Sequence, residues 1–316
     1  MSPDPHQDVG ELTLDEAGVE AARLRDELHR HSYLYYIEAR PEIGDSEYDE
    51  LFRRLQLIEE AHPELRSTDS PTQRIGADPH EKFETVEHTA PMLSLDSTKE
   101  ADEVRRFDER LRKALGEGHD PVYLVEPKLD GASIELVYED GVFVRAVTRG
   151  NGRAGEQVTE NVRTIRSVPL RLRTDDRPAP TLLALRGEVL MYISDFQDFN
   201  AGLVEAGGEP YASPRNSAAG SIRQLDSRIT ASRKLHLLVY DVLAVEGATF
   251  RSDADGVEAI RQWGFKVPER IQVVHTVDEI LEYHAAFGED RDGLDYEIDG
   301  VVVKLDDLTA RAAIGV

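Results

Sequence analysis

The run Glu126-Pro127-Lys128-Leu129-Asp130-Gly131 follows directly on the apolar stretch 122–125. The apolar stretch predicts a strand that leads into Lys128. Side chains two residues apart in a strand share a face, so Glu126 and Lys128 should point the same way. Lysine is rarely placed in an apolar strand without a use, which makes Lys128 a candidate nucleophile. The alternative is a Glu–Lys ion pair at the end of a strand.

A lysine nucleophile must first lose its proton. From an ordinary pKa of ~10.4 this costs roughly 4–5 kcal/mol at pH 7, so the site has to desolvate the amine or place other cations nearby. Arg149, at the end of the next predicted hairpin, could supply such a charge. Gly131 would let the backbone come close to a phosphate.

The residues after Gly131 predict a β-hairpin. Apolar and polar residues alternate over 132–138 and again over 142–146, and the turn dipeptide Asp140-Gly141 stands between them. Further strands are predicted at 182–190, 235–243 and 298–305, and helices at 196–206, 254–263 and 277–287, the last capped by Thr276 with Glu279. Strands joined by hairpins with helices interspersed predict an α+β fold rather than a doubly wound parallel sheet.

The first part of the chain predicts a helical hairpin. Residues 13–16 have the form of a capping box, Asp45 stands where a second N-cap belongs, and the second helix should end before Pro63. The residues expected on the core face of the first helix are Ala17, Ala21, Leu24, Leu28, His31 and Tyr35. A linker is predicted over 67–78, and a third capping box at 97–100 should open another helix.

Composition limits the class of protein. The 316 residues contain no cysteine, which excludes disulfides, thiolate chemistry and cysteine-based zinc sites. No apolar run approaches the ~18 residues of a membrane span, and the N-terminus lacks the features of a signal peptide. We therefore expect a soluble, cytoplasmic protein without a membrane partner, and a monomer.

The charge opposes nucleic-acid binding. Asp and Glu number 62 against 37 Lys and Arg, a net charge of −25, whereas binding to DNA relies on a basic surface. Residues 210–234 nevertheless hold five basic residues against one acidic residue, a local net charge of +4. Either nucleic acid is not a partner, or the acidity belongs to a solvated, salt-adapted surface on which basic residues cluster locally.

Further polar residues stand in predicted strands. Lys304 ends the run Asp299-Gly300-Val301-Val302-Val303-Lys304, and Arg186-Gly187-Glu188 follows an apolar stretch. Buried lysines are costly, so two of them in β context with a nearby glutamate suggest a cradle for an anionic ligand. With Ser94-Leu95-Asp96 and Thr148-Arg149-Gly150, this order resembles the covalent nucleotidyltransferases: DNA and RNA ligases and mRNA-capping enzymes. In that superfamily the lysine of a K-x-D-G motif attacks the α-phosphate of a nucleotide.

The N-terminal hairpin distinguishes the members of this superfamily. The run 35–51, Tyr-Tyr-Ile-Glu-Ala-Arg-Pro-Glu-Ile-Gly-Asp-Ser-Glu-Tyr-Asp-Glu-Leu, resembles the signature of a domain found in NAD-dependent DNA ligases. The segments 69–74 and 148–169 are similar to the same family, and the resemblance extends from Leu24 to Lys304. Taken singly, Asp45 could merely cap a helix and Tyr48 could merely belong to the core. The chain has Ala39 where the family often has a carboxylate, which puts one cofactor contact in doubt.

The resemblance implies a role for each matching residue. Lys128 would be the nucleophile, supported by Asp130, and no residue set suggests a dedicated metal cage. The residues implied to hold AMP are Ser94, Leu95, Glu126, Lys128, Arg149, Glu188 and Lys304, with Glu126 facing the adenine amine. Those implied to hold the nicotinamide mononucleotide half of NAD are Tyr35, Tyr36, Asp45, Tyr48 and Asp49. Those implied to approach nicked double-stranded DNA are Arg215, Arg223 and Arg291.

The resemblance also implies the organisation of the chain and its reaction. Residues 1–78 would form a helical NAD-recognition domain with its linker, and residues 79–316 a nucleotidyltransferase domain. Lys128 would take AMP from NAD with the help of Mg²⁺, for use in replication and repair. The family's last nucleotidyltransferase motif, OB-fold, zinc-binding, helix-hairpin-helix and BRCT regions are expected beyond Val316. Two alternatives are an ATP-using ligase or capping enzyme, disfavoured by the hairpin, and an NAD-sensing binding module, disfavoured by the intact Lys128 and Asp130.

Overall fold

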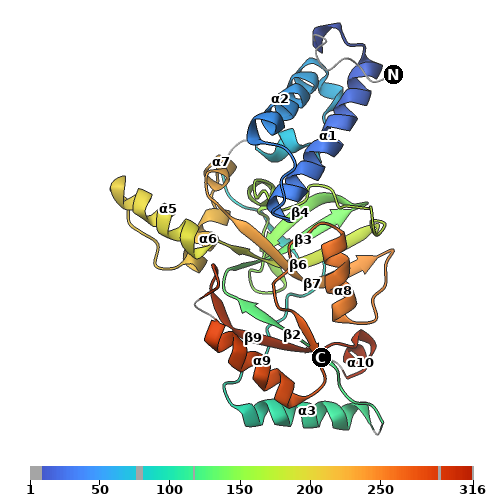
Figure 1. Ribbon diagram of the computed structural model, residues 1–316, viewed down its shortest axis with the longest axis vertical. Coiled ribbons are helices and arrows are strands. Elements are labelled where there is room, and N and C mark those ends of the chain that lie inside the picture. Colours follow the sequence, from blue (N-terminus) through green and yellow to red (C-terminus); the bar gives the residue numbers. More distant parts are fainter. Residues whose placement is uncertain (1–8, 76–80, 117, 291–292, 315–316) are drawn as a thin grey trace.

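The computed structural model describes residues 9–75, 81–116, 118–290 and 293–314. Figure 1 shows a helical N-terminal part at one end of the molecule, a layer of strands in the middle, and helices α3 and α9 at the opposite end. Strands and helices are mixed along the chain, and every strand pair is antiparallel. The predicted α+β class is confirmed.

The N-terminal part is a hairpin of helices α1 (Leu14–Tyr36) and α2 (Asp45–Ala61). The Thr13 hydroxyl accepts a hydrogen bond from the backbone N–H of Glu16, and the Glu16 carboxylate accepts one from that of Thr13, so the predicted capping box is confirmed. The second cap was predicted one residue late, because Gly44 is the N-cap of α2. Short 3₁₀ turns lie at η1 (Val9–Glu11), η2 (Pro63–Leu65) and η3 (Pro71–Arg74).

Most of the predicted face of α1 forms a small core with α2. The buried residues of this core are Val9, Leu12, Ala17, Ala21, Leu24, Leu28, Leu55 and Ile58. Tyr35 was expected on this face but is 49% exposed. The buried face reaches the end of the helix through Leu34 instead, because 3.6 residues per turn carry Tyr35 past the edge of the apolar stripe.

Four strands form the larger sheet, in the order β4-β3-β6-β7. Their bounds are β3 (Ala132–Glu139), β4 (Val142–Thr148), β6 (Leu182–Leu190) and β7 (His236–Glu246). The predicted hairpin joins β3 to β4 through Asp140 and Gly141, whose φ angles of 47° and 80° suit a tight two-residue turn. The largest core lies against this sheet and includes Trp263 and Phe265 after helix α8 (Asp253–Gln262).

Lys128 belongs to the second sheet. Strand β2 (Tyr123–Leu129) pairs with β8 (Gln272–Val274) on one side and β9 (Ile298–Leu305) on the other, with Lys128 opposite Gly300. A second core lies between this sheet and helices α3 (Ala101–Leu115), α9 (Val277–Asp290) and α10 (Leu308–Ile314). The nucleophile candidate therefore stands inside a central strand, near its end.

The remaining elements are short. Strands β1 (Thr85–Glu87) and β5 (Ala154–Glu156) pair with each other. The other helices are α4 (Thr159–Arg163), α5 (Ile193–Glu205), α6 (Pro214–Ile222) and α7 (Ser227–Ala231). The predicted capping box at 97–100 is wrong: α3 begins after Glu100, whose side chain makes no cap. The one predicted at Thr276 and Glu279 is confirmed by reciprocal hydrogen bonds of 3.2 and 2.9 Å.

Arginines connect the N-terminal hairpin to the rest of the chain. The Arg173 guanidinium lies 3.8 Å from the centre of the Tyr33 ring, and Arg171 bonds Asp69 at 2.5 Å. Arg74 is buried and donates to the carbonyls of Arg163, Ile165 and Val168. The expected domain boundary at 78/79 lies outside the described residues. Over the described ranges, no helix combines the length and apolar character needed to cross a membrane.

Candidate active site

A cavity of about 750 Å³ opens between the two sheets. Strands β2 and β9 supply one wall, and β3, β6, β7 and the end of β4 supply the other. Seven residues predicted to hold AMP line the cavity: Ser94, Leu95, Glu126, Lys128, Arg149, Glu188 and Lys304. The predicted DNA residues Arg215 and Arg223 also line it, whereas Asp130 does not. Residues from six segments far apart in the sequence thus meet at one hollow.

Lys128 stands at the wall of the cavity with a carboxylate partner. Its Nζ donates to Asp299 Oδ2 at 2.6 Å, and its side chain is 45% exposed. The expected desolvation of this amine is therefore not seen in the structure. Asp130 does not contact Lys128 in this way; it accepts a hydrogen bond from Arg215 Nη1 at 2.7 Å. Sequence reasoning assigned Asp299 no role beyond its place in a strand motif, because its contact with Lys128 arises only when β2 pairs with β9 and Gly300, the next residue, comes to lie opposite Lys128.

Gly131 lines the cavity and also lies where the chain packs closely against β6. A Cβ atom at this position would lie 2.4 Å from the Val189 carbonyl oxygen and 2.6 Å from Leu190 Cδ2. The glycine is therefore required by the close packing of the chain against β6, where any larger residue would force a shift.

Glu126 and Lys304 form a buried ion pair at the base of the cavity. Lys304 Nζ lies 2.8 Å from Glu126 Oε1, and both side chains are almost fully buried. Burial lowers the pKa of Lys304, but the carboxylates of Glu126, Asp241 and Asp253 outweigh this and hold it above its ordinary value. The second oxygen of Glu126 is buried and has no hydrogen-bond partner. It is free to accept a hydrogen bond from a ligand in the cavity.

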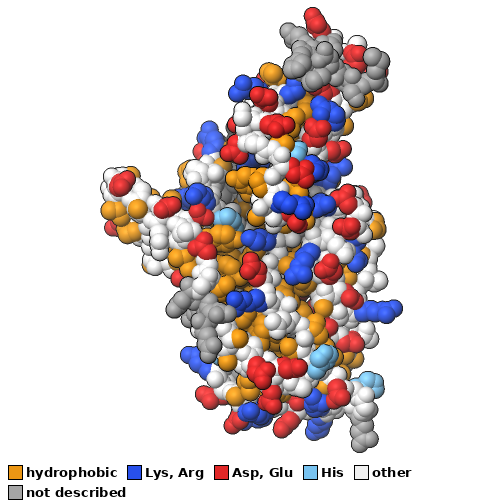
Figure 2. All heavy atoms as spheres, viewed as in Figure 1, with side chains coloured by type: hydrophobic (Ala, Val, Ile, Leu, Met, Phe, Trp, Pro, Cys, Tyr) orange, Lys and Arg blue, Asp and Glu red, His pale blue; other side chains and the backbone are white. Residues whose placement is uncertain are grey.

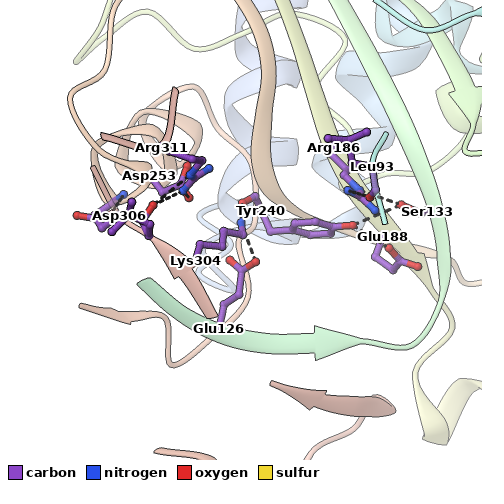
Figure 3. Close-up of polar contacts among 12 residues, drawn as sticks. Leu93, Glu126, Ser133, Arg186, Glu188, Tyr240, Asp253, Lys304, Asp306 and Arg311 are labelled. Atoms are coloured by element: carbon purple, nitrogen blue, oxygen red, sulfur yellow. Dashed lines mark hydrogen bonds and ion pairs between the residues drawn. The ribbon is translucent and has the colours of Figure 1, made fainter. Parts of the chain in front are cut away.

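Figure 3 shows the Tyr240 ring between two groups of polar side chains: Glu126 and Lys304 on one side, Arg186 and Glu188 on the other. Its hydroxyl donates to Glu188 at 3.1 Å, and Lys304 Nζ and the Arg186 guanidinium each lie 5.8 Å from its ring centre. Burial raises the pKa of Glu188 to about 7, against the opposing effects of the Tyr240 hydrogen bond and the Arg186 charge. Sequence reasoning missed Tyr240 because it stands in an apolar run that reads as core.

Arg149 and Ser94 are in contact at the cavity. Arg149 Nη2 donates to Ser94 Oγ at 2.7 Å, while its Nε is buried and has no partner. The structure thus brings together two segments, 94–95 and 148–150, that the sequence placed in the same site. Leu95 is 56% exposed and presents an apolar side chain to the opening.

Two of the arginines predicted to approach DNA form ion pairs with carboxylates. Arg223 bonds both oxygens of Glu156, at 2.5 and 2.9 Å, and Arg215 bonds Asp130. In the same basic segment, Arg228 pairs with Asp226 and Lys234 with Asp195. The local excess of basic residues is therefore largely balanced by ion pairs. Arg291 lies outside the described residues.

The residues predicted to hold nicotinamide mononucleotide lie together on the helical hairpin. The Tyr35 and Tyr36 rings at the end of α1 are 4.8 Å apart, and Tyr48 near the start of α2 bonds Ser32 at 3.0 Å. Burial raises the pKa of Tyr36, and the Tyr48 hydroxyl contributes in the same direction. Asp45 and Asp49 are exposed. None of these five residues lines the cavity.

The cavity provides single carboxylates rather than a metal cage. Among the described residues, no group of three or more His, Cys, Asp and Glu could hold a metal ion. Mg²⁺ commonly binds through one or two carboxylates together with substrate phosphates, and keeps several waters. Glu188, in the wall of the cavity, fits that kind of binding.

Comparison with known protein families identifies both parts of the chain. A family model described as the NAD-dependent DNA ligase adenylation domain matches residues 80–316. The chain belongs to the NAD-dependent DNA ligase family. A second model, the DNA ligase-like N-terminal NAD+-binding domain, matches residues 15–76.

Proteins similar to this chain carry names that agree with this family assignment. The DNA ligase of Salinibacter ruber is 45% identical over 318 residues, which cover 100% of this chain and 46% of that protein. The DNA ligase of Haloferax volcanii is 45% identical over 99% of this chain and 44% of its own length. That of Geobacter sulfurreducens is 49% identical over 93% and 44%. The chain thus spans less than half the length of these ligases.

Proposed function

We propose that this chain transfers AMP from NAD to Lys128 as the first step in sealing nicked DNA. Lys128 Nζ attacks the adenylyl phosphorus of NAD, a P–N bond forms, and the P–O bond to nicotinamide mononucleotide breaks. The leaving phosphate oxygen takes the electron pair. The observation that supports this most is the match to the adenylation-domain family together with Lys128 standing in the wall of a nucleotide-sized cavity.

The proposal gives each wall of the cavity a task. Asp299, 2.6 Å from Lys128 Nζ, is positioned to accept the proton that the amine must lose. The unpartnered oxygen of Glu126 accepts from the adenine amine. Arg149 and Lys304 provide positive charge for the phosphate, and Asp130 supports the reacting groups through Arg215. Mg²⁺, when bound, would screen the pyrophosphate and the developing charge, with Glu188 as its protein ligand.

The helical domain, residues 1–78, binds the nicotinamide mononucleotide half of NAD in this proposal. Tyrosine rings can stack on the cationic nicotinamide, and Asp45 and Asp49 can meet the ring charge and ribose hydroxyls. Because these residues lie away from the cavity, the domain has to move toward it when NAD binds. The complete reaction would pass AMP to the 5′-phosphate at a nick near Arg215, Arg223 and Arg291, during replication and repair, in a cytoplasmic monomer.

A mass measurement tests the transfer. Incubation with NAD and Mg²⁺ should add one AMP to the intact protein, and peptide mapping should locate it on Lys128. Lys128→Ala should abolish the addition, while Lys113→Ala, which removes an exposed lysine from α3, should leave it unchanged. AMP remaining attached to the Lys128→Ala protein would show that another residue is the nucleophile.

A further inference from the structure

We propose that His88 and Glu135 form a buried clamp that fixes the backbone of Arg149 and so directs the Arg149 side chain into the nucleotide cavity. His88 acts in this proposal as a positioning residue, since it does not line the cavity itself. The inference rests on the proposed function, because it concerns a residue proposed to contact AMP.

The geometry of the clamp is complete on both sides of the imidazole ring. His88 Nδ1 lies 2.9 Å from Glu135 Oε2, and His88 Nε2 lies 3.1 Å from the Arg149 carbonyl oxygen. The other carboxylate oxygen, Glu135 Oε1, accepts from the backbone N–H of Thr89 at 2.8 Å. Both side chains of the pair are 0% exposed. The ring therefore links the middle of β3 to the end of β4 without contact to water.

The partners determine where the protons lie. A carbonyl oxygen can only accept, so His88 Nε2 must carry a proton and donate it. A second proton then lies between Nδ1 and the Glu135 carboxyl group, whichever of the two holds it. Hydrogen bonds buried in this way are stronger than those exposed to water, and an unmet donor or acceptor left behind is costly.

The clamp acts on the residue that reaches the cavity. The Arg149 backbone is also held by its N–H, which donates to the Ser133 carbonyl at 3.0 Å, and by the Gly152 N–H, which donates to the Arg149 carbonyl at 2.9 Å. Of these three hydrogen bonds to the Arg149 backbone, the one from His88 is the one made by a side chain. With the backbone fixed, the Arg149 guanidinium reaches Ser94, and its buried Nε is left without a partner.

A buried ionisable pair needs a reason other than stability. Replacing such a pair by apolar residues of similar size is often neutral or stabilising, so its presence in the middle of a sheet points to positioning. His88 also begins the segment 88–95, which carries Ser94 and Leu95 to the cavity. The clamp thus holds together two segments that line the nucleotide site.

The test measures single-turnover addition of AMP to wild type, His88→Ala, Arg149→Ala and the double variant over a range of NAD concentrations. We expect His88→Ala to raise the half-saturating NAD concentration about tenfold, the effect of one lost buried hydrogen bond. The double variant should be no worse than Arg149→Ala, because the two residues act in series. A merely structural loss would lower the fraction of active protein and leave the half-saturating concentration unchanged.

Two conservative variants separate the two sides of the ring. The amide of His88→Gln can reach the position of Nε2 and donate to the Arg149 carbonyl, so this variant should restore most of the NAD affinity. The amide of His88→Asn reaches only the position of Nδ1, so this variant should behave like His88→Ala. Equal behaviour of the two variants, or additive losses in the double variant, would overturn the inference.

Calorimetric titration of the same proteins with AMP separates this inference from the proposed function. Wild type that takes no label from NAD would refute the proposed function. The clamp is then judged by AMP binding alone, which should weaken about tenfold in His88→Ala and be restored by His88→Gln. Unchanged AMP affinity in His88→Ala would refute the clamp.

Discussion

Replacing Glu188 with glutamine should make the protein more stable at alkaline pH. Glu188 is 7% exposed, and burial raises the pKa of its carboxyl group from 4.5 to about 7. A buried carboxyl of this kind is more easily protonated in the folded protein than in the unfolded chain. The stabilisation of the folded protein by this carboxyl group is therefore complete below pH 4.5 and is lost as the pH rises through 7.

The magnitude follows from the same pKa. Ionising a group whose pKa rises from 4.5 to about 7 on folding costs about 3 kcal/mol at pH 8. Glutamine removes this cost but can still accept the hydrogen bond from Tyr240. Glu188→Gln should therefore exceed wild type by about 3 kcal/mol in the free energy of unfolding at pH 8, and by less than about 1 kcal/mol at pH 5.

Urea unfolding followed by tryptophan fluorescence provides the assay. Trp263 is the single tryptophan and belongs to the same core as β6, which carries Glu188. Glu205→Gln, which changes an exposed glutamate at the end of α5, is the matched control and should show no such pH dependence. If the difference in free energy of unfolding between Glu188→Gln and wild type is the same at pH 5 and pH 8, the reasoning is refuted, because Glu188 then does not titrate between these values.

Two further predictions concern salt and the nucleotide donor. Figure 2 shows acidic and basic side chains interspersed over one face, and the net charge of the chain is −25. Molar salt shortens the Debye length to about 3 Å and so screens the repulsion between the acidic residues. Tm should therefore rise between low and molar KCl. A flat or falling Tm would leave the acidity without a salt explanation. Asp49→Ala should slow AMP transfer from NAD about thirty- to hundredfold, because a charge-assisted contact typically contributes about 2–3 kcal/mol, and wild type should not use ATP. Labelling by ATP as fast as by NAD would disprove the choice of donor.

The parts of the fold with regular sequence patterns could be predicted. Strands β6 and β9 have the predicted bounds, 182–190 and 298–305, because each carries a long, mainly apolar run that marks a buried strand. Helices α4 and α7 and strands β1, β5 and β8 were missed because each has three to five residues, too few to show a period.

The cavity was predictable through motifs and not through pattern alone. Lys128, Glu126 and Lys304 interrupt apolar strands, which is a visible signal. Glu135 gives no such signal, since it occupies the polar position of an alternating strand and reads as solvent-exposed. Only the tertiary fold shows that the segment from His88 onward covers that side of β3. The same limit applies to Tyr240, which stands in a mainly apolar strand.

The absence of a side chain at Gly131 has a mechanical consequence. Lys128 belongs to one sheet, while Glu188 and Ser133 belong to another, and no hydrogen-bonded ladder joins the two sheets among the described strands. The distance between Lys128 and the opposite wall is therefore set by a seam of packed atoms rather than by backbone hydrogen bonds. At Gly131 that seam closes onto the Val189 carbonyl. A single methyl group there would force the chain away from β6, shifting Lys128 relative to the opposite wall without changing any other side chain that lines the cavity.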